Sequence, residues 1–287
     1  MMIPIHFFTI VLNGMPFIRH HIGVFKRLHI PWHWHIIEGV ADLKYDTAWG
    51  VNDGAFIPRE FHNRGSSIDG TSEYLMFLLE QNRKTVSLYK KPPGEFWDGK
   101  LEMVKAPIKN LPSECLLWQV DSDELWEEGA IERVHQLFEA NPKKTSAYFY
   151  CHYFLGPKKH IVSDNVKSTG EHDWLRVWRF KRGLGWKSHE PPVLVNGGDR
   201  DYGQLKPFTR YETFGVGITF QHFAYATKES VKFKEKYYGY AGFLNHWKWL
   251  QRQRGRVLID RNLPWISSGT LIEDWDEAKY GKLLWKM

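Results

Sequence analysis

Cysteine is scarce in this 287-residue chain, which contains only Cys115 and Cys151. Both lie in stretches that we predict to be strands, and their spacing fits neither a metal site nor a disulfide framework. We therefore expect two small buried apolar side chains and a reducing, cytoplasmic environment.

Long apolar runs are absent as well. No stretch approaches the roughly 18 apolar residues that a membrane-spanning helix needs. The strand-like segment 6–12 follows the first residues directly, without the basic region and cleavage site of a signal peptide. Hydrophobic residues at 43% and charged residues at 25% are the balance of an ordinary soluble globular protein.

Positive charge is in excess, but only locally. The net charge is +6, and residues 228–256 contain eight Lys or Arg against two Glu, which accounts for the whole excess. Apolar residues recur at helical spacing from Phe233 to Leu250, so we predict an amphipathic helix there. Such a basic helix is most often a solvated face. The alternative is contact with an anionic partner, such as a peripheral membrane surface or a polyanion.

Strand and helix patterns alternate in the first part of the chain. The predicted strands are 7–12, 34–38 and 85–89, and the predicted helices are 16–28, 69–82 and 99–109. The first strand is closed by the turn pair Asn13-Gly14, and the second ends in Glu38. A strand–helix–strand order predicts a mostly parallel sheet, in which ligands bind beyond the carboxyl ends of the strands.

Three carboxylates within four residues follow a short apolar strand at 116–120. They are Asp121, Asp123 and Glu124. Side chains alternate along an extended chain, so Asp121 and Asp123 are expected to point the same way and could share one hard divalent cation. Such a cation keeps several waters and usually takes oxygens from a substrate phosphate. The alternative is a solvated acidic turn before the helix expected at 129–140.

The second half of the chain reads mainly as strands and loops. We predict strands at 146–154, 174–180 and 217–223, and a tail at 263–287 packed by Trp265, Trp275 and Trp285. The simplest fold is an α/β domain at 1–225, with a mostly parallel central sheet flanked by helices. Residues 226–287 are then a helical C-terminal extension packed on that domain.

This order of elements resembles the nucleotide-sugar glycosyltransferases of the GT-A fold, which is Rossmann-like. The resemblance covers roughly residues 5–225 and is carried by short motifs. These are Leu12-Asn13-Gly14, the acid Glu38, Asp69-Gly70-Thr71 and Asp121-Ser122-Asp123. The Asp-x-Asp form followed by Glu is most similar to family 2-like bacterial transferases and to the N-acetylglucosaminyltransferases of family 17.

The resemblance implies transfer of a hexosyl or N-acetylhexosaminyl group from a nucleotide-diphosphate donor to a glycan or other hydroxyl acceptor. It implies Mn²⁺ or Mg²⁺ as cofactor, held by Asp121, Asp123 and His222. The nucleotide sugar is then expected to contact Asn13, Glu38, Asp69 and Asp121.

The catalytic base is the point where the chain departs from the family pattern. Many members carry Glu-Asp after a glycine loop, whereas this chain has His189-Glu190-Pro191-Pro192. Glu190 is the expected base, with His189 as its rival or as a residue that orients it. Arg182 or Lys187 could assist the phosphates.

Each of these residues also has a structural explanation. Asn13 could be a turn residue, Glu38 a solvated strand end and Asp69 a helix cap. His222 could be an ordinary strand histidine, and 189–192 a rigid turn. Two other functions stay open: a nucleic-acid-binding or nucleic-acid-acting protein that uses 228–256, and a nucleotidyltransferase that uses the same aspartates.

Overall fold

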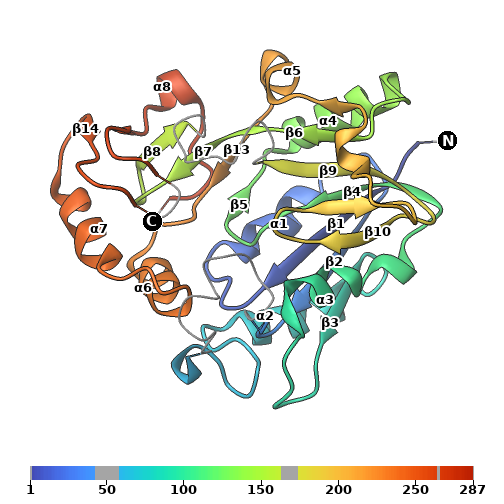
Figure 1. Cartoon of the computed structure of the whole chain (residues 1–287), viewed down its shortest axis with the longest axis horizontal. Helices are drawn as coiled ribbons and strands as arrows, with labels where there is room; N and C mark the ends of the chain where they lie inside the picture. The colour runs from blue at the N-terminus through green and yellow to red at the C-terminus, as the bar shows by residue number, and fades with distance from the viewer. Residues whose placement is uncertain (1, 43–57, 163–173, 264–265, 287) are drawn as a thin grey trace.

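The computed structural model describes residues 2–42, 58–162, 174–263 and 266–286. Its centre is a seven-stranded sheet with the strand order β12-β6-β9-β4-β1-β2-β3 (Figure 1). The bounds of these strands are β1 Ile5–Val11, β2 Trp32–Glu38, β3 Val86–Lys90, β4 Glu114–Gln119, β6 Ser146–Tyr148, β9 Leu175–Lys181 and β12 Pro207–Phe208. All neighbouring pairs are parallel except the two that β9 makes with β4 and β6. The predicted α/β fold with a mostly parallel sheet is confirmed.

Helices cover both faces of the central sheet, because alternate side chains of its strands are apolar on both sides. Phe7 of β1 belongs to the core cluster that includes residues of α1 (Ile18–Phe25), α2 (Thr71–Gln81) and α4 (Glu128–Ala140). Its neighbour Phe8 points the other way and packs in the cluster that includes α3 (Gly99–Lys105).

A second sheet has the order β14-β15-β8-β7-β13-β5. Its strands are β5 Glu124–Leu125, β7 Tyr150–Phe154, β8 Lys159–Val162, β13 Thr219–His222, β14 Val257–Leu258 and β15 Leu271–Asp274. The single strand predicted at 146–154 is therefore two strands, β6 and β7, which belong to different sheets. The chain changes sheet at the buried Phe149, whose N–H bonds to the carbonyl of Trp174. A continuous aromatic stretch carries no sequence signal for such a change.

The basic segment forms two helices rather than the single helix predicted. α6 (Lys228–Tyr237) and α7 (Phe243–Arg252) are separated by Gly239 and Gly242, which have φ values of 72° and 78°. Glycine adopts such left-handed conformations readily, and they interrupt the helix between α6 and α7. Residues 226–287 also contribute strands, because β15 pairs with β8.

The remaining elements are α5 (Arg210–Gly215), α8 (Glu277–Tyr280) and the hairpin of β10 (Gly185–Ser188) and β11 (Val193–Val195). Trp275 and Trp285 pack in a small cluster with Phe17, whereas Trp265 lies outside the described residues. Both cysteines are buried, as predicted. No helix in the described part of the chain is long and apolar enough to cross a membrane.

Candidate active site

A cavity of about 1000 Å³ lies beyond the carboxyl ends of β1 and β4 and is bordered by α6. It brings together residues that are far apart in the chain. The predicted site residues that line it are Asn13, Asp69, Asp121, Asp123, His189, Glu190 and His222. Of the eight residues predicted for the site, Glu38 alone is not among the lining residues. The position matches the expectation for ligand sites in open, mostly parallel sheets.

Asp121 and Asp123 both face the cavity from the turn between β4 and β5. Asp121 accepts a hydrogen bond from Gln119 Nε2 at 3.1 Å, and its side chain is 31% exposed. Asp123 is more enclosed and lies between two basic groups. Its Oδ1 is 3.4 Å from His222 Nε2, and its Oδ2 is 3.3 Å from Lys234 Nζ.

The third carboxylate of the acidic turn points inward. Glu124 is fully buried and binds Arg176 of β9, whose Nε lies 2.9 Å from both carboxylate oxygens and whose Nη2 lies 2.6 Å from Oε1. Burial raises the pKa of Glu124, although Arg176 opposes this shift. The same guanidinium lies 3.5 Å from Asp121 Oδ2. Arg176 therefore connects the buried part of the acidic turn to the cavity.

Strand pairing explains how His222 reaches the aspartates. β13 pairs antiparallel with β5 so that His222 lies opposite Glu124, and the N–H of Phe223 donates to the carbonyl of Asp123 at 2.7 Å. Burial acts to raise the pKa of Asp123, but Lys234 and His222 outweigh it and hold the pKa well below its usual range. Asp123 is therefore an anion at neutral pH.

The donor set around Asp123 fits a hard divalent cation in part. In the part of the chain that the structure describes, no three His, Cys, Asp or Glu side chains are arranged to hold a metal ion. Asp123 and His222, with 3.4 Å between Oδ1 and Nε2, form a two-residue set. Two protein ligands suffice for a cation that completes its shell with waters and substrate phosphate. Asp121, which the sequence also suggested as a ligand, lines the same cavity but is not part of this pair.

Asn13 and Asp69 border the cavity and also fix the loops around it. Asn13 has a φ of 57°; its Nδ2 donates to the carbonyl of Phe61 at 2.7 Å, and its Oδ1 accepts from the N–H of Ile68 at 2.9 Å. Asp69 accepts from the N–H groups of Met15 at 2.9 Å and Thr71 at 3.0 Å. These two side chains join the turn after β1 to the start of α2.

Glu38 does not line the cavity, but it also holds the segment that leads into α2. It is buried at the end of β2, where Oε1 accepts from the N–H of Ser67 at 3.1 Å and from the hydroxyl of Ser72. Its Oε2 lies 2.6 Å from Lys90 Nζ at the end of β3. Both oxygens therefore contact protein groups that hold the segment leading into α2.

His189 and Glu190 lie in the β10–β11 hairpin. Glu190 Oε1 is 2.6 Å from Lys100 Nζ and 3.8 Å from His189 Nδ1. Burial lowers the pKa of His189 to about 4, although Glu190 acts against this shift. The imidazole is therefore neutral at pH 7, and neither ring nitrogen has a hydrogen-bond partner among the described residues.

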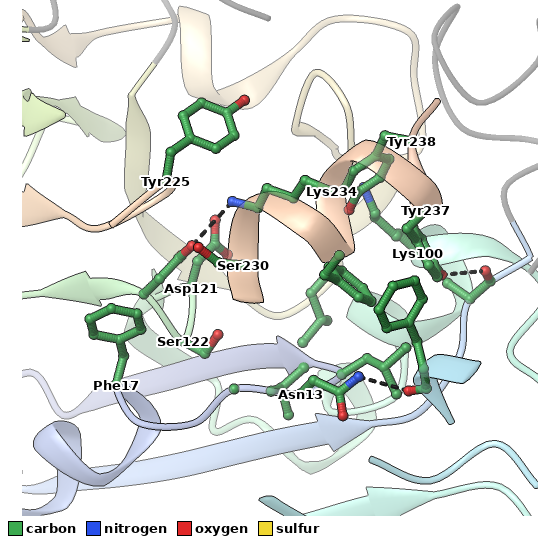
Figure 2. Close-up of a pocket in the computed structure, with 18 of the residues that line it drawn as sticks. Asn13, Phe17, Lys100, Asp121, Ser122, Tyr225, Ser230, Lys234, Tyr237 and Tyr238 are labelled. Carbon is green, nitrogen blue, oxygen red and sulfur yellow. Dashed lines mark hydrogen bonds and ion pairs between the residues drawn. The ribbon is translucent and has the colours of Figure 1, made fainter. Parts of the chain in front are cut away.

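The cavity also contains basic and aromatic residues that the sequence did not single out as site residues. Figure 2 shows Lys234 reaching from α6 towards the acidic turn, with Tyr237 at the end of the helix and Tyr238 directly after it. The basic and aromatic lining residues include Lys100, Arg176, Lys232, Lys234, Tyr153, Trp174, Tyr225, Tyr237 and Tyr238. Arg182 and Lys187 do not line the cavity. The excess of Lys and Arg at 228–256 was the sequence signal for the lysines of α6 that line the cavity. It did not indicate which of these lysines face the cavity.

No protein-family model matches the chain, and no curated protein does. Among solved structures, the chain is similar to S. aureus TarS 1–349, with 11% identity, a TM-score of 0.40, and 61% of this chain and 47% of that chain covered. It is also similar to the mannosyltransferase PcManGT from Pyrobaculum calidifontis in complex with GDP-Man and Mn²⁺, with 13% identity, a TM-score of 0.38, and 61% and 44% covered. A third similar structure, 4-diphosphocytidyl-2C-methyl-D-erythritol synthase, shows 11% identity and a TM-score of 0.34, with 79% and 92% covered. The chain thus spans less than half the length of the first two.

Proposed function

We propose that this protein is a glycosyltransferase that moves a hexosyl or N-acetylhexosaminyl group from a nucleotide-diphosphate donor to a hydroxyl acceptor, such as a glycan. The observation that carries the proposal is the meeting of Asp123, His222 and Lys234 at one wall of the cavity. In this proposal Asp123 and His222 are the ligands of a hard cation, and the Lys234 ammonium group lies beside them. A diphosphate is an anion that both can recognise.

The donor's leaving group requires positive charge. When the bond between the sugar's anomeric carbon and the diphosphate oxygen breaks, negative charge grows on that oxygen. Mn²⁺ or Mg²⁺, when bound, supplies Lewis-acid stabilisation of this charge. Asp123 and His222 are the residues that would hold it. Lys232 and Lys234 line the same cavity and are placed to contact the phosphates electrostatically.

The acceptor hydroxyl must lose a proton as it attacks. Glu190 is the proposed base, because its carboxylate lines the cavity and Lys100 holds one of its oxygens at 2.6 Å. The neutral His189 beside it is the alternative proton acceptor. The new bond joins the acceptor oxygen to the anomeric carbon, and the nucleoside diphosphate leaves.

The cavity has room for a large ligand such as a nucleotide sugar, and its lining suggests where each substrate binds. Pockets that bind one small ligand range from about 300 to 1,000 Å³, and this cavity lies at the upper end at about 1000 Å³. Tyr237 at the end of α6 and Tyr238 directly after it line the cavity, and aromatic rings pack well against the apolar faces of sugars. We therefore place the acceptor on the α6 side, with the nucleoside near Asn13 and Asp69.

A thermal-shift screen of nucleotide sugars with Mn²⁺, and separately with EDTA, tests the proposal. A ligand at about 100 times its dissociation constant stabilises the folded state by roughly 2.7 kcal/mol, which is readily measured. We expect a subset of UDP-, GDP-, CDP-, ADP- or dTDP-sugars to raise the melting temperature, and the rise to be larger with Mn²⁺. If no nucleotide sugar has an effect and a polynucleotide binds with steep salt dependence, the nucleic-acid function is favoured instead.

A further inference from the structure

Lys234 occupies an unusual position for a lysine of a surface helix. Its side chain is 21% exposed, and its ammonium group lies at the wall of the cavity. Nζ donates to the carbonyl of Ala224 at 2.8 Å and lies 5.0 Å from the centre of the Tyr225 ring. The distance to Asp123 Oδ2 is longer, at 3.3 Å. The lysine is thus fixed by a backbone carbonyl and only loosely bonded to the carboxylate, since charge-assisted bonds are usually about 2.7–2.9 Å.

The helix that carries Lys234 is anchored at several points across the cavity. Phe233 packs edge-on against Phe61 with 4.9 Å between ring centres, and the hydroxyl of Tyr237 donates to the carbonyl of Ala41 at 3.1 Å. Lys236 forms an ion pair with Glu60, which lies at the rim of the same cavity. The N-terminus of the helix is closed by a capping box between Thr227 and Ser230. These contacts hold α6 in place, so the position of the Lys234 ammonium follows from the fold.

A lysine ammonium has three N–H donors, and the described residues account for two of them, through Ala224 and Asp123. One donor is thus available to a ligand in the cavity. The bond to Asp123 can be exchanged if both groups gain a replacement partner, since neither charge is then left unpaired. A phosphate oxygen is a suitable new acceptor, and Asp123 is then left to bind a cation.

We propose that the Lys234 ammonium group pairs with the Asp123 carboxylate when no ligand is bound, and that it moves to a new partner when the donor binds. Without ligands it neutralises Asp123, and it competes there with a divalent cation. With the donor present it contacts the diphosphate. The part of this inference that concerns the diphosphate rests on the proposed function. The competition between Lys234 and a divalent cation at Asp123 can be tested with the metal alone.

The inference predicts opposite effects on two ligands when Lys234 is replaced by methionine, which has a similar length and no charge. Lys234→Met removes the cation that repels and displaces the metal, so Mn²⁺ alone should bind about tenfold more tightly. The same change removes a phosphate contact, so UDP or GDP in EDTA should bind about tenfold more weakly or worse. Lys234→Arg keeps the charge and should preserve nucleotide binding. A variant with a merely structural defect would weaken both ligands.

Isothermal titration calorimetry with MnCl₂ alone, and with UDP, GDP, CDP, ADP and dTDP in EDTA, measures both effects. Lys228→Met is the matched control, because Lys228 lies on the same helix, is exposed and does not line the cavity. It should bind both ligands like the wild type, and melting curves should show all variants folded.

Unchanged or weaker Mn²⁺ binding by Lys234→Met would overturn the competition. Unchanged nucleotide binding by this variant would overturn the exchange. If the wild type binds none of the nucleotides, even with Mn²⁺, the proposed function fails instead.

Discussion

Asp121 and Asp123 belong to the same motif, but they are expected to contribute differently to the stability of the fold because their neighbours differ. Asp123 lies between His222 and Lys234, whereas Asp121 is more exposed and adds negative charge near the buried Glu124. Removing the charge of Asp123 should leave Lys234 without its carboxylate partner. Removing the charge of Asp121 should relieve repulsion at Glu124.

We therefore predict that, without metal, Asp123→Asn lowers the free energy of unfolding by about 1–2 kcal/mol, whereas Asp121→Asn changes it by at most about 0.5 kcal/mol. Because the pKa of Asp123 is lowered by folding, its contribution is present above the unfolded-state pKa and is lost as the pH falls. Urea unfolding at pH 7 in EDTA measures both variants. Equal losses for the two substitutions would contradict the assignment.

Glu190 and His189 are the residues whose chemical roles can be separated by substitution. Glu190→Gln keeps the shape of the side chain and removes its proton acceptor, so turnover should fall by about 10² to 10⁴. The affinity for the donor should stay near that of the wild type, because the cation-binding residues belong to other elements. Steady-state rates and donor titration measure the two effects.

His189→Gln is the companion variant for this test. If Glu190→Gln turns over normally and His189→Gln does not, the imidazole is the base. If both variants are fully active, residues 189–192 are only a structural turn, as the sequence alone also allowed.

At the scale of secondary structure, β1 and β2 carry a cluster of histidines at their amino ends, away from the cavity. His6 Nδ1 lies 2.9 Å from His35 Nε2, and the His33 ring lies 4.6 Å from that of His35. Burial is the main cause that lowers the pKa of His6 to about 4 and that of His35 to about 2, and it lowers the pKa of His33 as well. The folded protein therefore favours three neutral rings.

This cluster predicts acid sensitivity with a defined sign. Below about pH 6.5 the unfolded chain binds protons that the folded cluster does not, so the free energy of unfolding should fall as the pH is lowered towards 4. Replacing His6 by Gln should reduce the loss between pH 7 and pH 4.5 by about 1 kcal/mol or more, since one pKa unit corresponds to 1.36 kcal/mol. Urea unfolding at the two pH values measures the difference. The same pH slope in wild type and His6→Gln would exclude the cluster as a cause.

The two helices of the basic segment lead to different expectations. On α6, Lys234 faces Asp123 and Lys236 pairs with Glu60. At the end of α7 and beyond it, Arg252 and Arg254 are exposed, close in sequence to the exposed Trp249. Contact with an anionic membrane surface therefore stays a prediction, and it belongs to α7 rather than to the whole segment.

Replacing Arg252 and Arg254 by Gln should reduce sedimentation with vesicles that contain phosphatidylserine. It should leave nucleotide binding unchanged, because neither arginine lines the cavity. The test is a comparison with neutral phosphatidylcholine vesicles at low salt, with Lys236→Met as a control. Equal binding of wild type and variant to the anionic vesicles would leave α7 as a solvated face.

At the scale of the whole molecule, local sequence patterns were sufficient to predict most helices and strands and the acidic residues at one wall of the cavity. Short apolar runs and helical spacing located β1, β2, β3, β4 and the helices between them, and the acids after β4 lie at the cavity as expected. The break at Phe149 and the contact between Lys234 and Asp123 could not be predicted. The first requires knowing which sheet each half-strand joins, and the second joins residues that are 111 positions apart.

The central claim is that this cavity binds a nucleotide sugar through Asp123 and its neighbours and releases a nucleoside diphosphate. The most direct measurement is the release of nucleoside diphosphate from a panel of UDP-, GDP-, CDP-, ADP- and dTDP-sugars, with simple sugars offered as acceptors, with Mn²⁺ or EDTA. We predict release from at least one donor by the wild type, stimulation by the metal, and a loss of at least about 10² in rate for Asp123→Asn. Release by Asp123→Asn at the wild-type rate, or none by a folded wild type from any donor, would contradict the account.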